Sequence, residues 1–254
     1  MKLVNSVKQN IKQGKPTFGC WIMTGNLAVA EILAQSGFDW LTIDMEHTSI
    51  DYGDLTVLLA GIQRHGVVPL VRIEENNPTV IKRVLDAGAM GIIVPMVLSG
   101  EEAEAAVKAA QYPPKGFRGV SLGRATDYGL NFDDYFGSIN EEVIVLAQIE
   151  HYRGVENIEA ILGVEGLDGV FIGPYDLSGS MNIIGQFDHP RMKEARQRVI
   201  ETTQKAGKAL GIHVVQPSIE ETKTRLAEGF NFIACSLDTI ILGNTARELV
   251  SALR

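Results

Sequence analysis

The sequence predicts an α/β protein of the (β/α)8 class, a TIM barrel, folded as a single domain over residues 1–254. Two observations predict it: short apolar runs rich in Val and Ile recur along the chain, and a helix–glycine–strand join connects them. Eight strands, each followed by a helical stretch, in about 250 residues fit this barrel. A doubly wound open sheet is the alternative, disfavoured because no Gly-x-Gly-x-x-Gly motif follows the first strand.

The repeated join consists of a helix-ending Leu, a Gly three or four residues later, and then an apolar run. A glycine just past a helix adopts the left-handed conformation that turns the chain back into a strand. The four joins carry Gly37, Gly88, Gly166 and Gly229. The predicted strands are Phe18–Met23, Trp40–Asp44, Val67–Arg72, Gly91–Pro95, Val143–Glu150, Gly169–Gly173, Ala209–Val214 and Phe230–Cys235.

Amphipathic stretches between the strands predict the covering helices, which include Asp51–Arg64, Pro78–Leu85, Glu101–Ala110 and Pro190–Lys205. An opening helix, Leu3–Ile11, is expected to cap the bottom of the barrel. The segment Pro113–Phe136 fits neither the helix nor the strand period. Its Gly, Tyr and Asp content predicts a long loop between the fourth and fifth strands, and long loops are often functional lids.

Composition narrows the classes of partner. A net charge of −8 argues against a nucleic-acid or anionic-membrane surface. Two cysteines, Cys20 and Cys235, are too few for a disulfide framework and indicate a reducing compartment. No stretch reaches the roughly 18 apolar residues of a membrane span. We therefore expect a soluble protein of the cytoplasm that acts on small molecules.

Several predicted strands end on charged residues, which would meet at one edge of a parallel barrel, where such folds place their chemistry. Glu150 and Asp176 end the fifth and sixth strands. Two carboxylates without a Cys or His partner suit a hard divalent cation such as Mg²⁺ or Mn²⁺. The alternative is a pair of solvated acids at the rim of the barrel.

A base and a cation are predicted at the same edge. Arg72 ends an apolar strand, where its guanidinium would bind a carboxylate or an oxyanion; the alternative is an ion pair with Glu74 or Glu75. His47 follows Asp44 and Glu46 in one short turn, and neighbouring acids favour its action as a base. The remaining histidines are weaker candidates, with His213 at the end of the seventh strand ahead of His65, His151 and His189.

Two absences restrict the reaction type. No lysine ends a predicted strand, whereas a Schiff-base aldolase needs a desolvated lysine inside the barrel. No Gly-rich phosphate loop follows the seventh or eighth strand, so a phosphosugar substrate is disfavoured.

The motifs resemble those of the HpcH/HpaI family of metal-dependent 2-oxo-acid aldolases. The run Phe38–His47 resembles the family signature, and so do Val71–Arg72, Gln148–Glu150 and Ile172–Ser178 with the trailing Gly185 and His189–Pro190. The resemblance covers about Gly19 to Arg254, in order and without large gaps.

The resemblance implies a (β/α)8 barrel in a homo-hexamer with terminal helices exchanged between subunits. It implies that Glu150 and Asp176 hold a divalent metal cation, Mg²⁺, Mn²⁺ or Co²⁺. Pyruvate would chelate that cation, with Gln148 and the backbone near Tyr175 also touching the substrate. Tyr175, Met45 and the segment Ser121–Phe136 depart from the family pattern, which leaves the aldehyde partner open.

The resemblance also implies catalytic roles. His47 matches the catalytic base, Arg72 the arginine that stabilises the enolate, and Asp44 a nearby supporting acid. Asp86 matches an aspartate that raises the basicity of the histidine. Because Asp86 is predicted near the end of a helix, away from the mouth of its own barrel, its action would be on a neighbouring subunit.

The implied activity is that of a class II aldolase, which cleaves 4-hydroxy-2-oxo acids to pyruvate and an aldehyde through a metal-stabilised pyruvate enolate. Oxaloacetate decarboxylation would use the same enolate. A citrate-lyase or malyl-CoA-lyase type of enzyme is an alternative, but it needs a basic groove, and the long segment offers only Lys115, Arg118 and Arg124. The sequence also leaves open a barrel isomerase and a non-catalytic barrel that binds 2-oxo acids.

Overall fold

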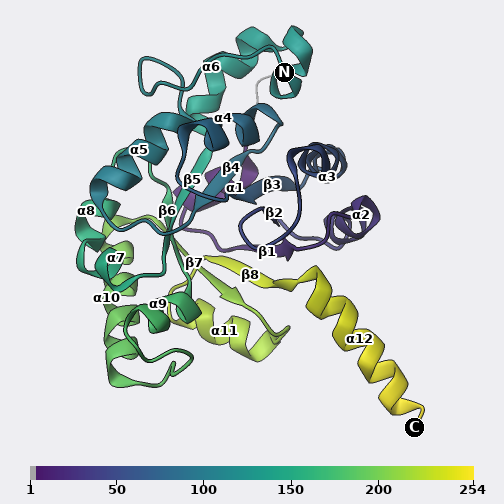
Figure 1. The fold of residues 1–254 in the computed structure, drawn as a ribbon, viewed down its shortest axis with the longest axis vertical. Coiled ribbons are helices and arrows are strands. Elements are labelled where there is room, and N and C mark those ends of the chain that lie inside the picture. Colours follow the sequence, from purple (N-terminus) through teal and green to yellow (C-terminus); the bar gives the residue numbers. More distant parts are fainter. Residues whose placement is uncertain (1–3) are drawn as a thin grey trace.

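The computed structural model describes residues 4–254, and over them the chain forms a closed barrel of eight parallel strands in sequence order (Figure 1). This confirms the predicted fold class. Each strand pairs with the next, and β1 pairs with β8 to close the barrel. The strands are β1 Thr17–Ile22, β2 Trp40–Asp44, β3 Val68–Arg72, β4 Gly91–Val94, β5 Ile144–Ile149, β6 Gly169–Ile172, β7 Ala209–Val214 and β8 Phe232–Leu237.

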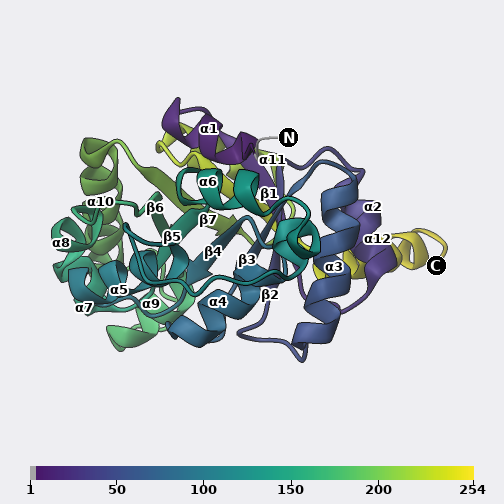
Figure 2. The ribbon, with the colours of Figure 1, turned by 90° about the horizontal axis from the view of Figure 1, so that it is seen from above.

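Helices surround the barrel (Figure 2). They are α1 Ser6–Lys12, α2 Leu27–Ala34, α3 Tyr52–Arg64, α4 Pro78–Asp86, α5 Gly100–Ala110, the 3-10 helix η1 Arg124–Gly129, α6 Phe132–Glu142, α7 Tyr152–Glu156, α8 Ile158–Leu162, α9 Pro174–Ser180, α10 Pro190–Ala206, α11 Ile219–Ala227 and α12 Asp238–Ala252. The end of the barrel that carries the C-terminal ends of the strands is called the mouth below. None of the helices in residues 4–254 has the length and apolar character required to cross a membrane.

The repeated glycine join is confirmed. The glycines after α2, α4, α8 and α11 all have positive φ, and each reverses the chain into the next strand. The ends of the strands differ more from prediction. The eighth strand begins and ends two residues later than expected, at Phe232 and Leu237, because Phe230 and Asn231 connect the turn after α11 to the strand.

The inside of the barrel is filled by large rings. The Trp40 and Phe232 rings stack with their centroids 4.1 Å apart, and Trp21 packs against Phe171. A Cβ atom at Gly19 would lie 2.1 Å from the Trp40 ring, so only glycine leaves room for this indole. These residues form a core that is separate from the layer outside the strands.

The opening helix caps this inner core, as predicted. Val7 and Ile11 of α1 pack into the same cluster as the inward-facing rings. The helix spans Ser6–Lys12; Leu3, the first residue of the predicted helix Leu3–Ile11, lies outside the described residues. Asn5 supplies the N-cap by accepting a hydrogen bond from the backbone N–H of Lys8.

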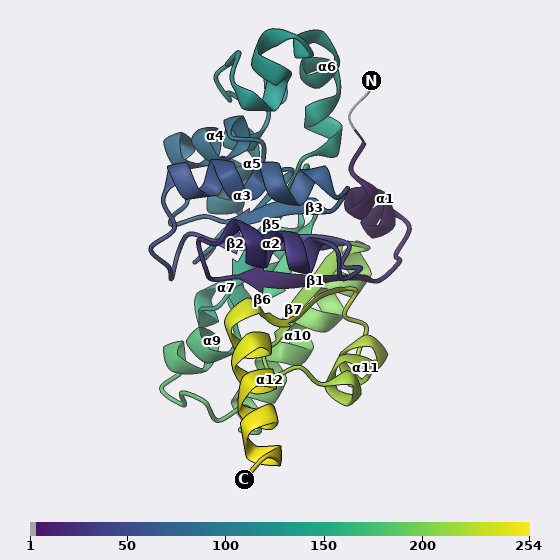
Figure 3. The ribbon, with the colours of Figure 1, turned by 90° about the vertical axis from the view of Figure 1, so that its right-hand side faces the viewer.

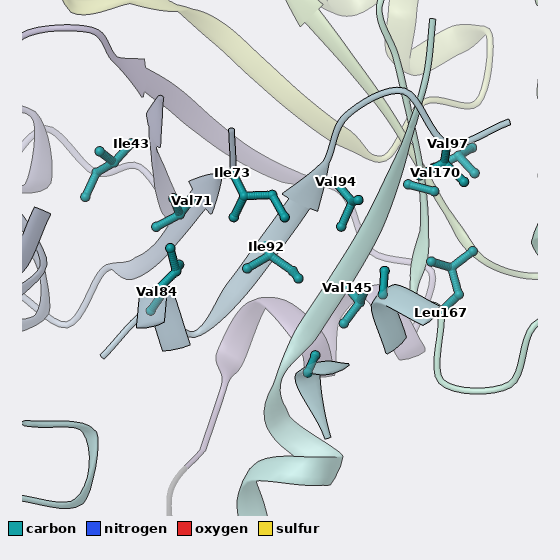
Figure 4. Packing of buried hydrophobic residues seen from close by; sticks show 14 of the residues in the cluster. Ile43, Val71, Ile73, Val84, Ile92, Val94, Val97, Val145, Leu167 and Val170 are labelled. Carbon is teal, nitrogen blue, oxygen red and sulfur yellow. The ribbon is translucent and has the colours of Figure 1, made fainter. Parts of the chain in front are cut away.

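The second core lies between the strands and the helices (Figure 4). Because side chains alternate along a strand, the residues between the inward-facing ones point outward to the helices. Figure 4 shows such outward-facing residues from neighbouring strands beside one from α4: Ile43, Val71, Ile92, Val94, Val145 and Val84. This double burial explains why the strands read as continuous apolar runs.

The prediction for Pro113–Phe136 is wrong in two respects. The segment is not one loop, since it contains η1 and the start of α6. It also lies at the end of its own barrel opposite to the mouth, because it follows α5 and precedes β5. Arg124 donates hydrogen bonds to the Ala87 carbonyl and to Gln63, near the ends of α4 and α3. The segment is therefore not a lid over the site of its own barrel.

The last helix leaves the barrel. Figures 1 and 3 show α12 projecting from the body of the molecule with its C-terminal end far from the strands. Among the residues of α12, only Asp238 is buried. Its apolar side chains Leu242, Leu249 and Val250 are exposed, as is Leu253 just past the helix.

Candidate active site

An arginine–carboxylate pair forms one wall of the mouth. Arg72 at the end of β3 donates from Nε to Asp44 Oδ1 at 2.9 Å and from Nη2 to Asp44 Oδ2 at 2.6 Å. Asp44 is fully buried at the end of β2. Burial alone would lower the pKa of Arg72, but its hydrogen bonds and charge interaction with Asp44 raise it. Arg72 thus pairs with Asp44, and with Glu46 at 3.3 Å, rather than with Glu74 or Glu75.

Asp44 also shapes the turn that carries the candidate base. Its Oδ1 accepts hydrogen bonds from the backbone N–H groups of Glu46 and His47. This arrangement places the His47 Nε2 3.7 Å from Glu46 Oε2, with more than half of the His47 side chain (57%) exposed to solvent in the mouth. Burial raises the pKa of Glu46, opposed by the charge of Arg72.

Glu150 lies just past β5, and only 3% of it is exposed. Its Oε1 accepts a hydrogen bond of 2.7 Å from the backbone N–H of Met96, and its Oε2 accepts one from the Gln148 side chain. Met96 has a φ of +51°, a conformation rare for a residue with a side chain. Burial raises the pKa of Glu150; the two hydrogen bonds oppose this rise, and the charge of Asp176 adds to it.

The residues at this end fit a divalent cation. Two carboxylates interact, one of them buried, and a cation would remove the cost of their repulsion. Gln148 Oε1 is buried and has no hydrogen-bond partner in the described structure, so a water bound beside it could donate to it. A Cβ at Gly173 would lie 2.9 Å from Glu150 Oε2, so glycine keeps the space beside the carboxylate open.

Two carboxylates alone do not complete a coordination shell. Within residues 4–254, no group of three or more acids, histidines or cysteines is placed to hold a metal ion. Hard cations commonly retain waters and accept substrate oxygens as ligands, so two protein acids suit a cation whose shell the substrate completes.

Tyr175 and Asp176 lie in the first turn of α9, directly after β6. The Tyr175 side chain is mostly exposed and meets the half-buried Phe187 ring edge to face at 4.9 Å. This turn follows β6 at the mouth, and the Tyr175 ring packs against Phe187 in the loop that precedes α10.

Asp86 is not brought to this site. It is the last residue of α4, at the opposite end of the barrel, and its Oδ1 accepts a hydrogen bond of 2.7 Å from Arg118. A cavity of about 770 Å³ is lined by residues of α5 and by residues at the bottom of the barrel, with charges of both signs such as Lys8, Glu104 and Lys108. Its position, far from the strand ends that carry Arg72, separates it from the chemistry of the mouth.

Three of the weaker histidines cap helices. His65 follows α3, while the Nδ1 atoms of His151 and His189 accept hydrogen bonds from backbone N–H groups at the starts of α7 and α10. His213 differs, because its ring lies inside the barrel and stacks on Trp21 with centroids 5.0 Å apart. Trp21 in turn lies 5.5 Å from the Arg72 guanidinium.

Sequence reasoning overlooked some residues of this site. Glu46 is predicted only as a neighbour of His47, with no role of its own, and Trp21, near the end of the first strand, is given no role. Met96 contributes its backbone N–H, which its unusual positive φ directs at Glu150. The residue type at this position does not predict that conformation.

Known proteins resemble this chain over nearly its full length. Residues 17–245 match the family model described as HpcH/HpaI aldolase/citrate lyase. The chain is 36% identical over 250 residues to the hydroxypyruvate/pyruvate aldolase of Roseobacter denitrificans, covering 98% of this chain and 96% of that protein. It is 40% identical over 249 residues to the 4-hydroxy-2-oxo-heptane-1,7-dioate aldolase of Shigella sonnei, covering 97% and 94%.

A solved structure shows that the similarity includes the fold. A HpcH/HpaI aldolase/citrate lyase family protein from Burkholderia cenocepacia aligns with a TM-score of 0.94 and 34% identity, covering 99% of this chain and 100% of that one. Aldolases related over nearly the full chain support an enzyme of the carbon–carbon lyase class. The chain belongs to the HpcH/HpaI aldolase/citrate lyase family.

Proposed function

We propose that the mouth of the barrel is the site of a class II pyruvate aldolase, with Glu150 and Asp176 as the ligands of a divalent cation, Mg²⁺, Mn²⁺ or Co²⁺. The observation that carries this proposal is that the Arg72–Asp44 pair lies near a buried Glu150. The charges of Arg72 and Glu150 interact across the mouth. When bound, the cation would act as a Lewis acid on a 2-oxo group.

The protein's own groups supply the remaining chemistry. Arg72 offsets the negative charge that develops on the enolate oxygen, and Asp44 holds the guanidinium in place through two hydrogen bonds. His47, exposed in the mouth, removes the proton of the C4 hydroxyl during cleavage and returns it during addition. Gln148 and the backbone at Tyr175 contact the pyruvate half.

The substrate class follows from the same groups. Cleavage of a 4-hydroxy-2-oxo acid gives pyruvate and an aldehyde, both of them small molecules. The two named aldolase relatives are consistent with 2-oxo acids at this site. A lyase of the citrate-lyase or malyl-CoA type has less support, because it needs a basic groove and the long segment offers only Lys115, Arg118 and Arg124. A non-catalytic 2-oxo-acid-binding barrel has less support, because it would not need a base in addition to the two carboxylates.

We also propose that the protein is a cytoplasmic homo-oligomer, a hexamer. The projecting helix α12, with its exposed apolar side chains, supports a partner that covers it (Figure 3). Asp86 lies at the end of its own barrel opposite to the mouth. If it raises the basicity of a catalytic histidine, that histidine is the His47 of a neighbouring subunit.

The central test combines activity with direct metal binding. EDTA should abolish cleavage, and borohydride with pyruvate should trap no lysine adduct. By calorimetry, Glu150→Gln and Asp176→Gln should bind Mn²⁺ far more weakly than wild type, whereas the exposed Glu101→Gln serves as the control that retains binding. A trapped adduct, or wild-type Mn²⁺ affinity in both mouth variants, would show that the mechanism is wrong.

A further inference from the structure

His213 is the one imidazole of residues 4–254 whose ring stacks on the barrel's inner core. It lies near the end of β7 and packs flat on Trp21, with an angle of 22° between the rings. Its Nε2 is 3.1 Å from the backbone carbonyl oxygen of Ser236. A carbonyl oxygen can only accept, so Nε2 carries the hydrogen and donates it.

The Ser236 carbonyl, which fixes the tautomer of His213 with the hydrogen on Nε2, belongs to a residue with an unusual backbone conformation. Ser236 has a φ of +71°, and its Oγ donates to the Val215 carbonyl at 2.9 Å. The register between β1 and β8 also shifts here, between Gly19 and Trp21. Backbone conformations of this kind are sparsely populated and persist where the surroundings fix them, frequently at functional sites.

The ring is neutral under ordinary conditions. The pKa of His213 is lowered to about 4, chiefly by burial and also by the charge of Arg72, while the Ser236 carbonyl and Asp44 act in the opposite direction. A neutral imidazole that donates from Nε2 has a bare acceptor at Nδ1.

Among the described residues, the His213 ring forms its hydrogen bond to Ser236 through Nε2, and none is formed through Nδ1. The His213 residue is partly exposed. His213 stacks on the Trp21 indole, and the Arg72 guanidinium lies 5.5 Å from the centroid of the same indole. The bare nitrogen therefore belongs to the same mouth as the enolate-stabilising arginine.

We propose that His213 is a specificity-determining residue, whose Nδ1 accepts a hydrogen bond from a substrate hydroxyl other than the C4 hydroxyl. This inference rests on the proposed aldolase function. Pyruvate and simple aldehydes offer only acceptor oxygens, and leave a bare nitrogen unpaired when they displace water from it. The hydroxyl comes either from the aldehyde or from the 2-oxo acid that forms the enolate.

Two pairs of nearly isosteric substrates distinguish these sources. In the first, pyruvate is combined with glycolaldehyde or with propionaldehyde. In the second, propionaldehyde is combined with hydroxypyruvate or with 2-oxobutyrate. The measured quantity is the ratio of kcat/KM values within each pair, which cancels any general loss of activity in a variant.

Two substitutions distinguish the role of Nδ1 as a hydrogen-bond acceptor from the role of the ring in stacking on Trp21. His213→Phe keeps an aromatic ring on Trp21 and removes both nitrogens, and His213→Asn places an amide oxygen near the position of Nδ1. His213→Phe should lower the hydroxyl preference about 3- to 10-fold in one pair, the range expected for one hydrogen bond. His213→Asn should retain more of the preference. His189→Asn, in which a remote helix cap is replaced by another capping residue, should retain it fully.

The outcomes are distinguishable. A preference unchanged by His213→Phe in both pairs, or lost in His213→Asn but kept in His213→Phe, would overturn the role of Nδ1. The proposed aldolase function is checked separately by exchange of the pyruvate methyl protons in D₂O with Mg²⁺ on the wild-type protein. Absence of that exchange would contradict the proposed function itself.

Discussion

Asp44 links the two catalytic groups through one carboxylate. It accepts two hydrogen bonds from the Arg72 guanidinium and two from the backbone of the turn that carries His47. Because the arginine and the histidine share this support, removal of Asp44 would disturb both. Substitution of Arg72 or His47 individually separates their contributions better.

We expect Arg72→Ala and His47→Ala to differ between two reactions. Arg72→Ala should slow both oxaloacetate decarboxylation and retro-aldol cleavage, because both develop charge on an enolate oxygen. His47→Ala should slow cleavage about 10²–10⁴-fold. It should slow decarboxylation much less, because carbon dioxide departs without removal of a hydroxyl proton. Both rates are measured on both variants, with circular dichroism as the control for folding.

Equal losses in the two reactions for His47→Ala would contradict its role as the cleavage base. They would mean that His47 orients the substrate or a bound water, and that the proton is taken by another group in the mouth.

At the scale of elements, α1 is fixed to the bottom of the barrel by a buried ion pair. Lys8 Nζ donates to the Val143 carbonyl and lies 3.1 Å from the Asp168 carboxylate, which also accepts from the backbone N–H of Val145. The pair joins the capping helix to the start of β5 and to the residue before β6.

We expect Lys8→Met to lower the free energy of unfolding by about 3–5 kcal/mol, because it leaves a desolvated carboxylate unpaired. Chemical denaturation measures this change. The solvent-exposed Lys12→Met is the matched control, with a change within about 0.5 kcal/mol. The double variant Lys8→Met with Asp168→Asn should recover part of the loss.

The loss should also depend on pH. Burial raises the pKa of Asp168, so the native state binds this proton more tightly than the unfolded state does. The stability gained from that proton is fully present below the ordinary aspartate pKa and is lost as pH rises through the raised value. Removing Lys8 raises the pKa further, so the deficit of Lys8→Met should be smaller at about pH 5 than at about pH 8. A deficit independent of pH would contradict the buried-charge explanation.

At the scale of the whole molecule, α12 is the helix that extends away from the barrel instead of packing along it. It projects away from the strands (Figure 1) and exposes Leu242 (67%) and Leu249 (64%) to solvent. Apolar side chains gathered on one projecting helix are typical of a surface that another chain covers.

We expect Leu242→Glu combined with Leu249→Glu to reduce the assembly to smaller species in sedimentation experiments, because charged groups would enter an apolar contact. Glu248→Gln on the same helix is the control that should leave the assembly intact. A monomeric wild-type protein, or an assembly unaffected by both glutamates, would contradict the proposed role of α12.

The sequence by itself determined the barrel and most of its mouth. Apolar runs buried on both faces and the four glycine joins are local signals, and they predicted the strand order without any knowledge of contacts. Residues that end such strands, such as Asp44, Arg72 and Glu150, were predictable as neighbours because parallel strands terminate at one edge.

Only the tertiary structure decided what those residues contact. It paired Arg72 with Asp44, placed the Met96 N–H on Glu150, and set His213 on Trp21 against the Ser236 carbonyl. It also moved the segment Pro113–Phe136 to the far end of the barrel and turned α12 outward. These features depend on backbone conformations with positive φ and on packing between distant segments, which residue type and periodicity do not encode.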